Sequence, residues 1–124
     1  MAGIYIHIPF CKRKCHYCNF YSVPSLRYKD ELIAALHNEL LLQKNYLDET
    51  VETIYFGGGT PSLLAVDDVK RIIDTVRDNY LLHSNPEITL EANPDDVDAQ
   101  KVMELKNSEI NRVSIGVQSF FHED

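Results

Sequence analysis

All three cysteines of this chain lie within the short stretch "CKRKCHYC". Cys11, Cys15 and Cys18 follow the spacing C-x3-C-x2-C. An odd number of thiols cannot form a closed disulfide set, and clustered cysteines without a secretory context indicate metal binding. Thiolates are soft ligands that select iron–sulfur clusters, zinc or copper(I). A 4Fe–4S cluster needs one ligand per iron, so three cysteines would leave one iron open to an outside molecule.

Two other interpretations of these cysteines remain open. Zinc could bind the three thiolates and His16, but His16 directly follows Cys15, whereas structural zinc sites normally use two separated pairs. Buried cysteines acting as small hydrophobic residues are the second alternative. The neighbouring Lys12, Arg13 and Lys14 are too polar for such an environment, and they would stabilise thiolates or a negatively charged cluster. The sequence therefore favours a cluster over zinc, and zinc over buried cysteines.

A second candidate site is the segment "YFGGGTPS", residues 55–62. Gly57, Gly58 and Gly59 let the backbone turn sharply and approach a ligand closely. Their amides could meet a carboxylate or an amino-acid head group. The phosphate-binding patterns G-x4-G-K-[ST] and G-x-G-x-x-G are absent here. A simple turn before Pro61 is the alternative, and the two interpretations carry equal weight.

Polar side chains near strand ends extend the candidate site. Glu91, in "TLEANP", and Gln118, in "SIGVQS", each end a predicted strand and could hydrogen-bond hydroxyl, amide or ammonium groups. Tyr5 and His7 lie on the polar face of the first predicted strand. For each of these residues an ordinary structural role is the alternative. No Ser–His–Asp or H-E-x-x-H pattern is present in the sequence, and no residue is assigned as catalytic.

Strands that alternate with helices must position these residues. Hydrophobic patterns predict strands at 4–8, 53–56, 87–91 and 112–118, and helices at 28–46, 66–80 and 98–106. This order indicates an α/β fold with four parallel strands joined by right-handed crossovers. The predicted core stripes of the helices include Leu36, Leu40, Leu41, Val102 and Leu105.

Apolar and polar residues alternate along these strands. Ile4, Ile6 and Ile8 share one face, opposite Tyr5 and His7. Parallel sheets covered on both faces usually contain continuous apolar runs. The alternation therefore predicts one face packed on helices and one polar face, as in a barrel interior that holds a ligand near the C-terminal strand ends. The same pattern places Ile88, Leu90, Val113, Ile115 and Val117 on the packed face.

The length of the chain, 124 residues, suits one ordinary domain. Four strands cannot close a barrel, and both edges of such a sheet would expose unpaired backbone groups. The sequence also stops at "QSFFHED", directly after a predicted strand. We therefore expect residues 1–124 to be an incomplete core domain, the N-terminal portion of a longer protein.

Composition narrows the class of protein. Hydrophobic residues make up 44% and charged residues 25%, which is normal for a globular domain, and the longest apolar runs are too short to cross a bilayer. The N-terminus lacks the features of a secretory signal, so a cytoplasmic location is expected. The formal net charge of −7 argues against nucleic acid as a partner.

Taken together, the motifs resemble those of the radical S-adenosylmethionine superfamily. "CKRKCHYC" is similar to its C-x3-C-x2-C motif, and "GGGTP" is similar to its glycine motif. "YIHIPFC", "YFGGGTPS", "EANP" and "RVSIGVQSF" resemble, in the same order, the oxygen-independent coproporphyrinogen III oxidase family. The resemblance spans residues 4–120 and implies the N-terminal part of a radical SAM, partial TIM-like βα barrel.

The resemblance also implies roles for individual residues. Cys11, Cys15 and Cys18 would ligate a 4Fe–4S cluster whose open iron binds S-adenosylmethionine. The cluster would deliver an electron that cleaves the sulfonium, giving methionine and a 5′-deoxyadenosyl radical, so an electron donor is an implied partner. The residues implied to contact S-adenosylmethionine or face its cavity are Tyr5, Tyr17, Gly58, Gly59, Thr60, Glu91 and Gln118.

One position departs from the oxidase pattern. The oxidases resembled here tend to read C-x3-C-x2-C-x-C, and this chain has Phe20 at the last position. The departure favours a resemblance to the HemW group of heme chaperones, which implies heme as a partner bound outside this chain. The alternative is an oxidase that decarboxylates propionates of a porphyrinogen to vinyl groups. A non-catalytic zinc-bound α/β module is a third, weaker interpretation.

Overall fold

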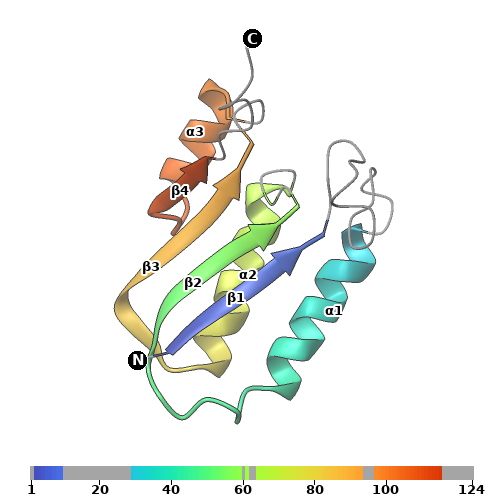
Figure 1. Ribbon diagram of the computed structural model, residues 1–124, viewed down its shortest axis with the longest axis vertical. Helices are drawn as coiled ribbons and strands as arrows, with labels where there is room; N and C mark the ends of the chain where they lie inside the picture. Colours follow the sequence, from blue (N-terminus) through green and yellow to red (C-terminus); the bar gives the residue numbers. More distant parts are fainter. Residues whose placement is uncertain (1, 10–28, 60, 62–63, 94–96, 116–124) are drawn as a thin grey trace, which may run out of the picture.

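The structure is a computed structural model that describes residues 2–9, 29–59, 61, 64–93 and 97–115. Within these residues, strands and helices alternate along the chain (Figure 1). The elements are β1 (Ala2–Ile8), α1 (Lys29–Leu42), β2 (Val51–Gly58), α2 (Val66–Asn79), β3 (Leu82–Ala92), α3 (Ala99–Lys106) and β4 (Arg112–Ile115). The strands pair in parallel in the order β1-β2-β3-β4. The predicted α/β alternation with four parallel strands is confirmed.

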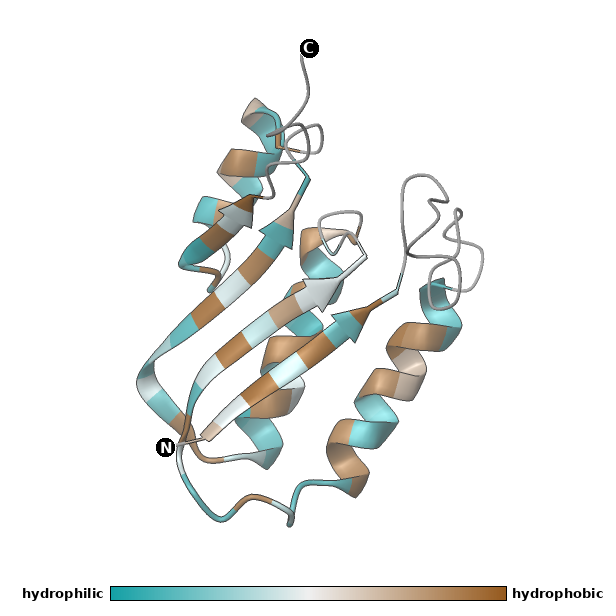
Figure 2. Cartoon of the chain, viewed as in Figure 1, coloured by the Kyte–Doolittle hydropathy of each residue, from teal (hydrophilic) through white to brown (hydrophobic). Residues whose placement is uncertain are grey.

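One face of the sheet is apolar and buried. Ile6, Ile8, Ile54, Phe56 and Leu90 are at most 3% exposed, and they form one core with buried residues of all three helices. Figure 2 shows the strands banded alternately by hydropathy, as the sequence pattern predicts. The opposite face therefore carries the polar side chains of the strands.

The helix α2 supplies most of the helical side of this core. Its buried residues recur at the spacing of a single helix face, and they are Val66, Val69, Ile72, Ile73 and Val76. Asp67 and Asp68 lie in its first turn and Arg77 in its last, which suits the helix dipole. This buried face of α2 packs against the sheet, and α2 accordingly runs behind β1 and β2 in Figure 1.

Polar contacts hold α1 against α2. His37 Nδ1 lies 2.7 Å from Thr75 Oγ1, and the hydroxyl of Tyr80 donates a 2.8 Å hydrogen bond to the carbonyl oxygen of Leu40. Ile33 and Leu40 are the buried residues of α1. These contacts fix the position of α1, which begins at Lys29.

Several boundaries and core residues differ from the sequence expectation. The first helix ends at Leu42 instead of residue 46, and residues 43–46 form turns. The side chains of Leu41 and Val102 are 45% and 38% exposed, so their predicted place in the core was wrong. Val113 and Ile115 of β4 are also exposed, so their predicted place on the packed face was wrong as well.

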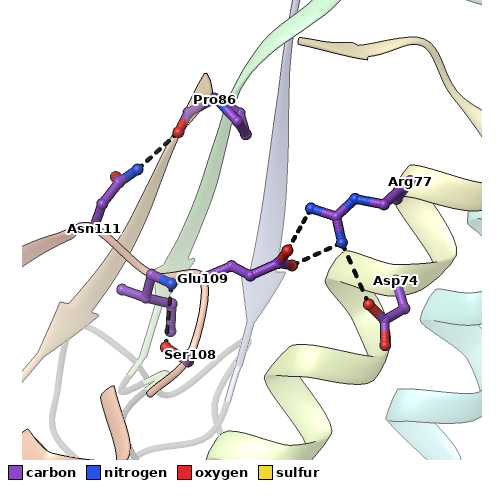
Figure 3. A network of polar contacts seen from close by, with 7 residues as sticks. Asp74, Arg77, Pro86, Ser108, Glu109 and Asn111 are labelled. Carbon is purple, nitrogen blue, oxygen red and sulfur yellow. Dashed lines mark hydrogen bonds and ion pairs between the residues drawn. The ribbon is translucent and has the colours of Figure 1, made fainter. Parts of the chain in front are cut away.

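The start of β4 is anchored by the network in Figure 3. The side-chain amide of Asn111 donates a 2.7 Å hydrogen bond to the carbonyl oxygen of Pro86, and its Oδ1 accepts one of 2.9 Å from the amide of Ile88. Arg77 of α2 donates a 2.9 Å hydrogen bond to the carboxylate of Glu109. The loop before β4 is therefore tied to both β3 and α2.

In the described part of the chain, no helix combines the length and apolar character that crossing a bilayer requires.

Candidate functional site

The candidate site lies on the polar face of the sheet, toward the C-terminal ends of the strands. All strand arrows in Figure 1 point toward this edge. His7 is in register with Gly57, and Glu91 is in register with Ser114. Since side chains alternate along a strand, polar groups of all four strands share this end of one face. Ligands of parallel α/β proteins commonly bind at the same end.

The glycine segment makes a close approach to β1. Gly58 has φ +115°, a conformation that residues with a Cβ rarely adopt. A Cβ at Gly57 would lie 2.9 Å from the rings of both Tyr5 and Tyr55. The amide of Gly59 donates a 2.7 Å hydrogen bond to the carbonyl oxygen of Ile8. The glycines therefore let β2 turn closely beside the end of β1 and under two aromatic rings.

Glu91 is held by donors from the neighbouring strand. Its Oε1 accepts a 3.1 Å hydrogen bond from the amide of Gly58, and its Oε2 accepts one of 2.7 Å from the hydroxyl of Tyr55. Glu91 is half-buried, so the charge is partly shielded from water. An ionised carboxylate offers about four acceptor positions, so each oxygen keeps capacity for a ligand donor.

Tyr5 lies next to Tyr55, the residue whose hydroxyl donates to Glu91. Its ring stacks on that of Tyr55 with centroids 5.8 Å apart and an interplanar angle of 17°. Its hydroxyl lies 3.2 Å from Nδ1 of His7. Partial burial, and then the negative charge of Glu91, raise the pKa of the Tyr5 phenol. The side chain is still 57% exposed, so its outer face is open to a ligand.

The Tyr55 phenol also has a raised pKa. The largest cause is its hydrogen bond to Glu91, followed by burial, while a hydrogen bond with Ser114 acts in the opposite direction. A neutral phenol is the form that can donate to a carboxylate. Tyr55 therefore remains a donor at neutral pH.

The predicted site residues divide into two groups. Tyr5, Gly58, Gly59 and Glu91 come together at one edge of the sheet, as described above. The residues that lie outside the described part of the chain are Cys11, Cys15, Cys18, Tyr17, Thr60 and Gln118. The strand that leads to the cysteines, β1, ends at this same edge.

Tyr55 and Ser114 were not among the predicted site residues. The strand alternation could have indicated Tyr55, because it lies between the buried residues Ile54 and Phe56 and so faces the polar side. Its contact with Glu91 depends on the register of β2 against β3, which pairs Tyr55 with Thr89. The sequence pattern alone does not fix that register.

Comparison with known proteins gives related sequences over nearly the whole chain. The chain is 41% identical to the heme chaperone HemW of Escherichia coli K12 over 127 residues, covering 98% of this chain and 33% of that protein. It is 40% identical to the heme chaperone HemW of Bacillus subtilis over 129 residues, covering 97% of this chain and 32% of that protein. The chain thus spans about a third of the length of these relatives.

A solved structure gives the same fold. The match, described as coproporphyrinogen III oxidase (HemN) from Escherichia coli, a radical SAM enzyme, has a TM-score of 0.83 and 29% sequence identity. It covers 98% of this chain and 29% of the other. The open sheet of parallel strands and helices therefore matches part of a radical SAM fold, as the sequence predicts.

The profile of the Radical SAM superfamily matches residues 5–123. Members of this superfamily generally use S-adenosylmethionine and a 4Fe–4S cluster. The match covers almost the whole sequence, including the cysteine and glycine motifs, and it agrees with the fold and with the related sequences. This chain belongs to the radical SAM superfamily.

Proposed function

We propose that this chain is the cofactor-binding part of a HemW-like heme chaperone. Cys11, Cys15 and Cys18 hold a 4Fe–4S cluster, and the remaining iron binds S-adenosylmethionine. The observation that carries the proposal is the hydrogen bond from the amide of Gly58 to Glu91. This bond lies at the edge of the sheet where β1 ends, and β1 ends three residues before Cys11. The identity of about 40% to HemW relatives supports the assignment to that group.

The described residues fit S-adenosylmethionine chemically. The ligand carries an ammonium group and ribose hydroxyls, which are donors, and Glu91 retains acceptor capacity on both oxygens. Because Gly57 and Gly58 lack side chains, their backbone lies close against Tyr5, Tyr55 and His7. Tyr5, Gly58, Gly59 and Glu91 would bind the ligand here, together with Tyr17, Thr60 and Gln118. When bound, the cluster supplies the electron for reductive cleavage of the sulfonium.

The chain's own part in this chemistry is binding and orientation. Glu91 would hold donor groups of the ligand, and the stacked rings of Tyr5 and Tyr55 would exclude water on one side. An external electron donor is required as a partner, and heme binds in the part of the protein beyond this chain. Three cysteines used as metal ligands suit the reducing cytoplasm, where we place the protein.

A second candidate function is favoured by the structural match to the oxidase HemN. In that case the 5′-deoxyadenosyl radical would take a hydrogen atom from a propionate side chain of coproporphyrinogen, and loss of carbon dioxide and of one electron to an external electron acceptor would leave a vinyl group. Phe20, which stands where the oxidases resembled here carry a further cysteine, favours the chaperone. The two functions differ in whether a porphyrinogen is converted or heme is only carried.

Anaerobic reconstitution of the full-length protein with iron and sulfide tests the cofactor site. We expect a brown protein whose electron paramagnetic resonance spectrum, after reduction, changes when S-adenosylmethionine is added. A colourless protein that retains zinc would support the non-catalytic module instead. A cluster that is fully ligated by protein and unaffected by S-adenosylmethionine would also contradict the proposal.

Incubation of the reconstituted full-length protein with coproporphyrinogen, reductant and S-adenosylmethionine separates the two functions. Tight stoichiometric heme binding without a vinyl product supports the chaperone. Formation of the vinyl product supports the oxidase.

A further inference from the structure

The carboxylate of Glu91 is held on both oxygens, by two different kinds of donor. The backbone amide of Gly58 reaches Oε1 at 3.1 Å, and the hydroxyl of Tyr55 reaches Oε2 at 2.7 Å. One donor on each oxygen restricts rotation of the carboxylate about its terminal bond. A hydrogen bond from a neutral donor to a carboxylate is also stronger than one between two neutral groups.

The Tyr55 hydroxyl is itself held in place. Tyr55 is in register with Thr89, so it reaches Glu91 diagonally across the pair of strands. Its ring stacks on that of Tyr5, and an interaction with the Ser114 side chain of β4 opposes the rise in its pKa. Contacts from β1 and β4 thus hold the Tyr55 side chain beside Glu91 of β3.

We infer that Tyr55 is a positioning residue that orients Glu91 toward S-adenosylmethionine, an inference that rests on the function proposed above. Tyr55 and Gly58 each occupy one acceptor position of the carboxylate, and the positions that remain are fixed in direction. A fixed carboxylate loses less freedom when a ligand binds, which raises affinity without any new contact. Tyr55 acts through Glu91 and not by contact with the ligand.

The test uses the full-length protein with its cluster reconstituted, and measures the dissociation constant of S-adenosylmethionine by equilibrium dialysis. Tyr55→Phe keeps the ring that stacks on Tyr5 and removes only the hydroxyl. We expect it to weaken binding about 10-fold, or about 1.4 kcal/mol, while the iron content and the visible spectrum stay unchanged.

Tyr80→Phe is the matched control. The hydroxyl of Tyr80 also donates a single 2.8 Å hydrogen bond, but to the carbonyl oxygen of Leu40 on the helical side of the sheet. Both variants lose one hydroxyl and the hydrogen bond that it donates, so both are expected to lower the melting temperature. Only Tyr55→Phe is expected to change the affinity for S-adenosylmethionine. Equal losses of affinity in the two variants would show that the loss comes from general destabilisation of the protein, and they would overturn the inference.

Ser114→Ala provides a second, milder test if Tyr55→Phe folds poorly. Ser114 lies exposed on β4, so its replacement does not disturb the core. It removes a hydroxyl that interacts with Tyr55, and we expect about 2- to 3-fold weaker binding of S-adenosylmethionine. Unchanged binding in both Ser114→Ala and Tyr55→Phe overturns the inference.

The same measurements separate this inference from the proposed function. If the wild-type protein holds a cluster but does not bind S-adenosylmethionine, the proposed function itself fails. If the wild-type protein binds S-adenosylmethionine and Tyr55→Phe binds it equally well, only the positioning role of Tyr55 fails.

Discussion

The carbonyl oxygen of Ile8 accepts the amide of Gly59 at 2.7 Å, which ties the turn after β2 to the last residue of β1. A Cβ on Gly58 would fall 2.6 Å from that same oxygen, in a residue whose φ is +115°. The close approach of the two strand ends therefore depends on a residue without a side chain. This contact therefore fixes the end of β1, the strand that precedes the cysteine segment in the sequence.

Replacement of Gly58 by alanine is predicted to destabilise the protein. The added Cβ meets backbone, which cannot move aside, and the required φ is strained for alanine. We expect Gly58→Ala to lower the free energy of unfolding by about 2–4 kcal/mol, measured by urea denaturation of the full-length protein.

Gly3→Ala is the control for this substitution. A Cβ at Gly3 would also be close to another atom, 2.5 Å away, but that atom is Oγ1 of Thr53, the end of an exposed side chain that can rotate. We expect a loss of less than about 1 kcal/mol for Gly3→Ala. Equal losses at the two glycines would show that the backbone at Gly58 is not the cause.

Asn111 is predicted to stabilise the junction between β3 and β4. Its side chain accepts from the amide of Ile88 and donates to the carbonyl oxygen of Pro86, the contact drawn in Figure 3. Asn111→Ala leaves both backbone groups without that partner, which should cost about 1–3 kcal/mol in a urea denaturation experiment. Asn79→Ala removes only a 2.8 Å bond to Thr75 within α2 and should cost under about 0.5 kcal/mol. A smaller loss at Asn111 than at Asn79 would contradict this prediction.

The sequence was sufficient to predict the fold, but not every contact of the site. The alternation of Ile4, Ile6 and Ile8 with polar residues correctly indicates which face is buried, because period-two burial follows directly from strand geometry. Leu41 and Val102 fit the apolar spacing of a helix as well as the buried residues do, yet both are exposed. Periodicity along a helix does not show how far the sheet that covers it extends. The sequence predicts a strand that begins at residue 87, yet β3 begins at Leu82, which pairs with Val51 across a register shift.

The candidate site was likewise predictable from the sequence only in part. Glu91 and Gly58 are recognisable from their motifs, whereas the hydrogen bond between Tyr55 and Glu91 needs the relative placement of two strands that are far apart in sequence. Tyr55 is the first residue of the segment "YFGGGTPS", but that motif does not indicate a contact with Glu91, and only the three-dimensional structure brings its hydroxyl to the carboxylate.

The raised pKa of Tyr55 gives a prediction for alkaline pH. The phenol has a higher pKa in the folded chain, first because it donates to Glu91 and then because of burial. Its contribution to stability is therefore complete below the unfolded pKa, about 10, and is lost as pH rises through the folded pKa. The difference in unfolding free energy between wild type and Tyr55→Phe should be constant up to about pH 10 and shrink above it.

Urea denaturation of both proteins across this pH range measures that difference. Comparison with Tyr55→Phe is necessary because the pKa values of Tyr5 and Tyr80 are raised as well, and both of these residues are present in the two proteins. A gap between the two proteins that widens above pH 10 would have the wrong sign and would reject the assigned cause.

Substitution of one cysteine tests the metal assignment most directly. If Cys15 is one of three thiolate ligands of a 4Fe–4S cluster, Cys15→Ser should abolish cluster assembly, because a serine hydroxyl is a much poorer ligand for iron. The measurement is iron and sulfide content after anaerobic reconstitution of the full-length protein, together with the visible spectrum. A Cys15→Ser protein with the full iron content that still cleaves S-adenosylmethionine would refute the assignment.

His16→Ala separates the cluster from the zinc alternative. In the zinc interpretation His16 is the fourth ligand, so its loss should sharply lower zinc affinity and leave a three-ligand site. In the cluster interpretation no imidazole is needed, and His16→Ala should assemble as much iron and sulfide as the wild-type protein. Loss of metal in both Cys15→Ser and His16→Ala would favour zinc, whereas loss in Cys15→Ser alone follows from a cluster whose fourth iron is left for S-adenosylmethionine.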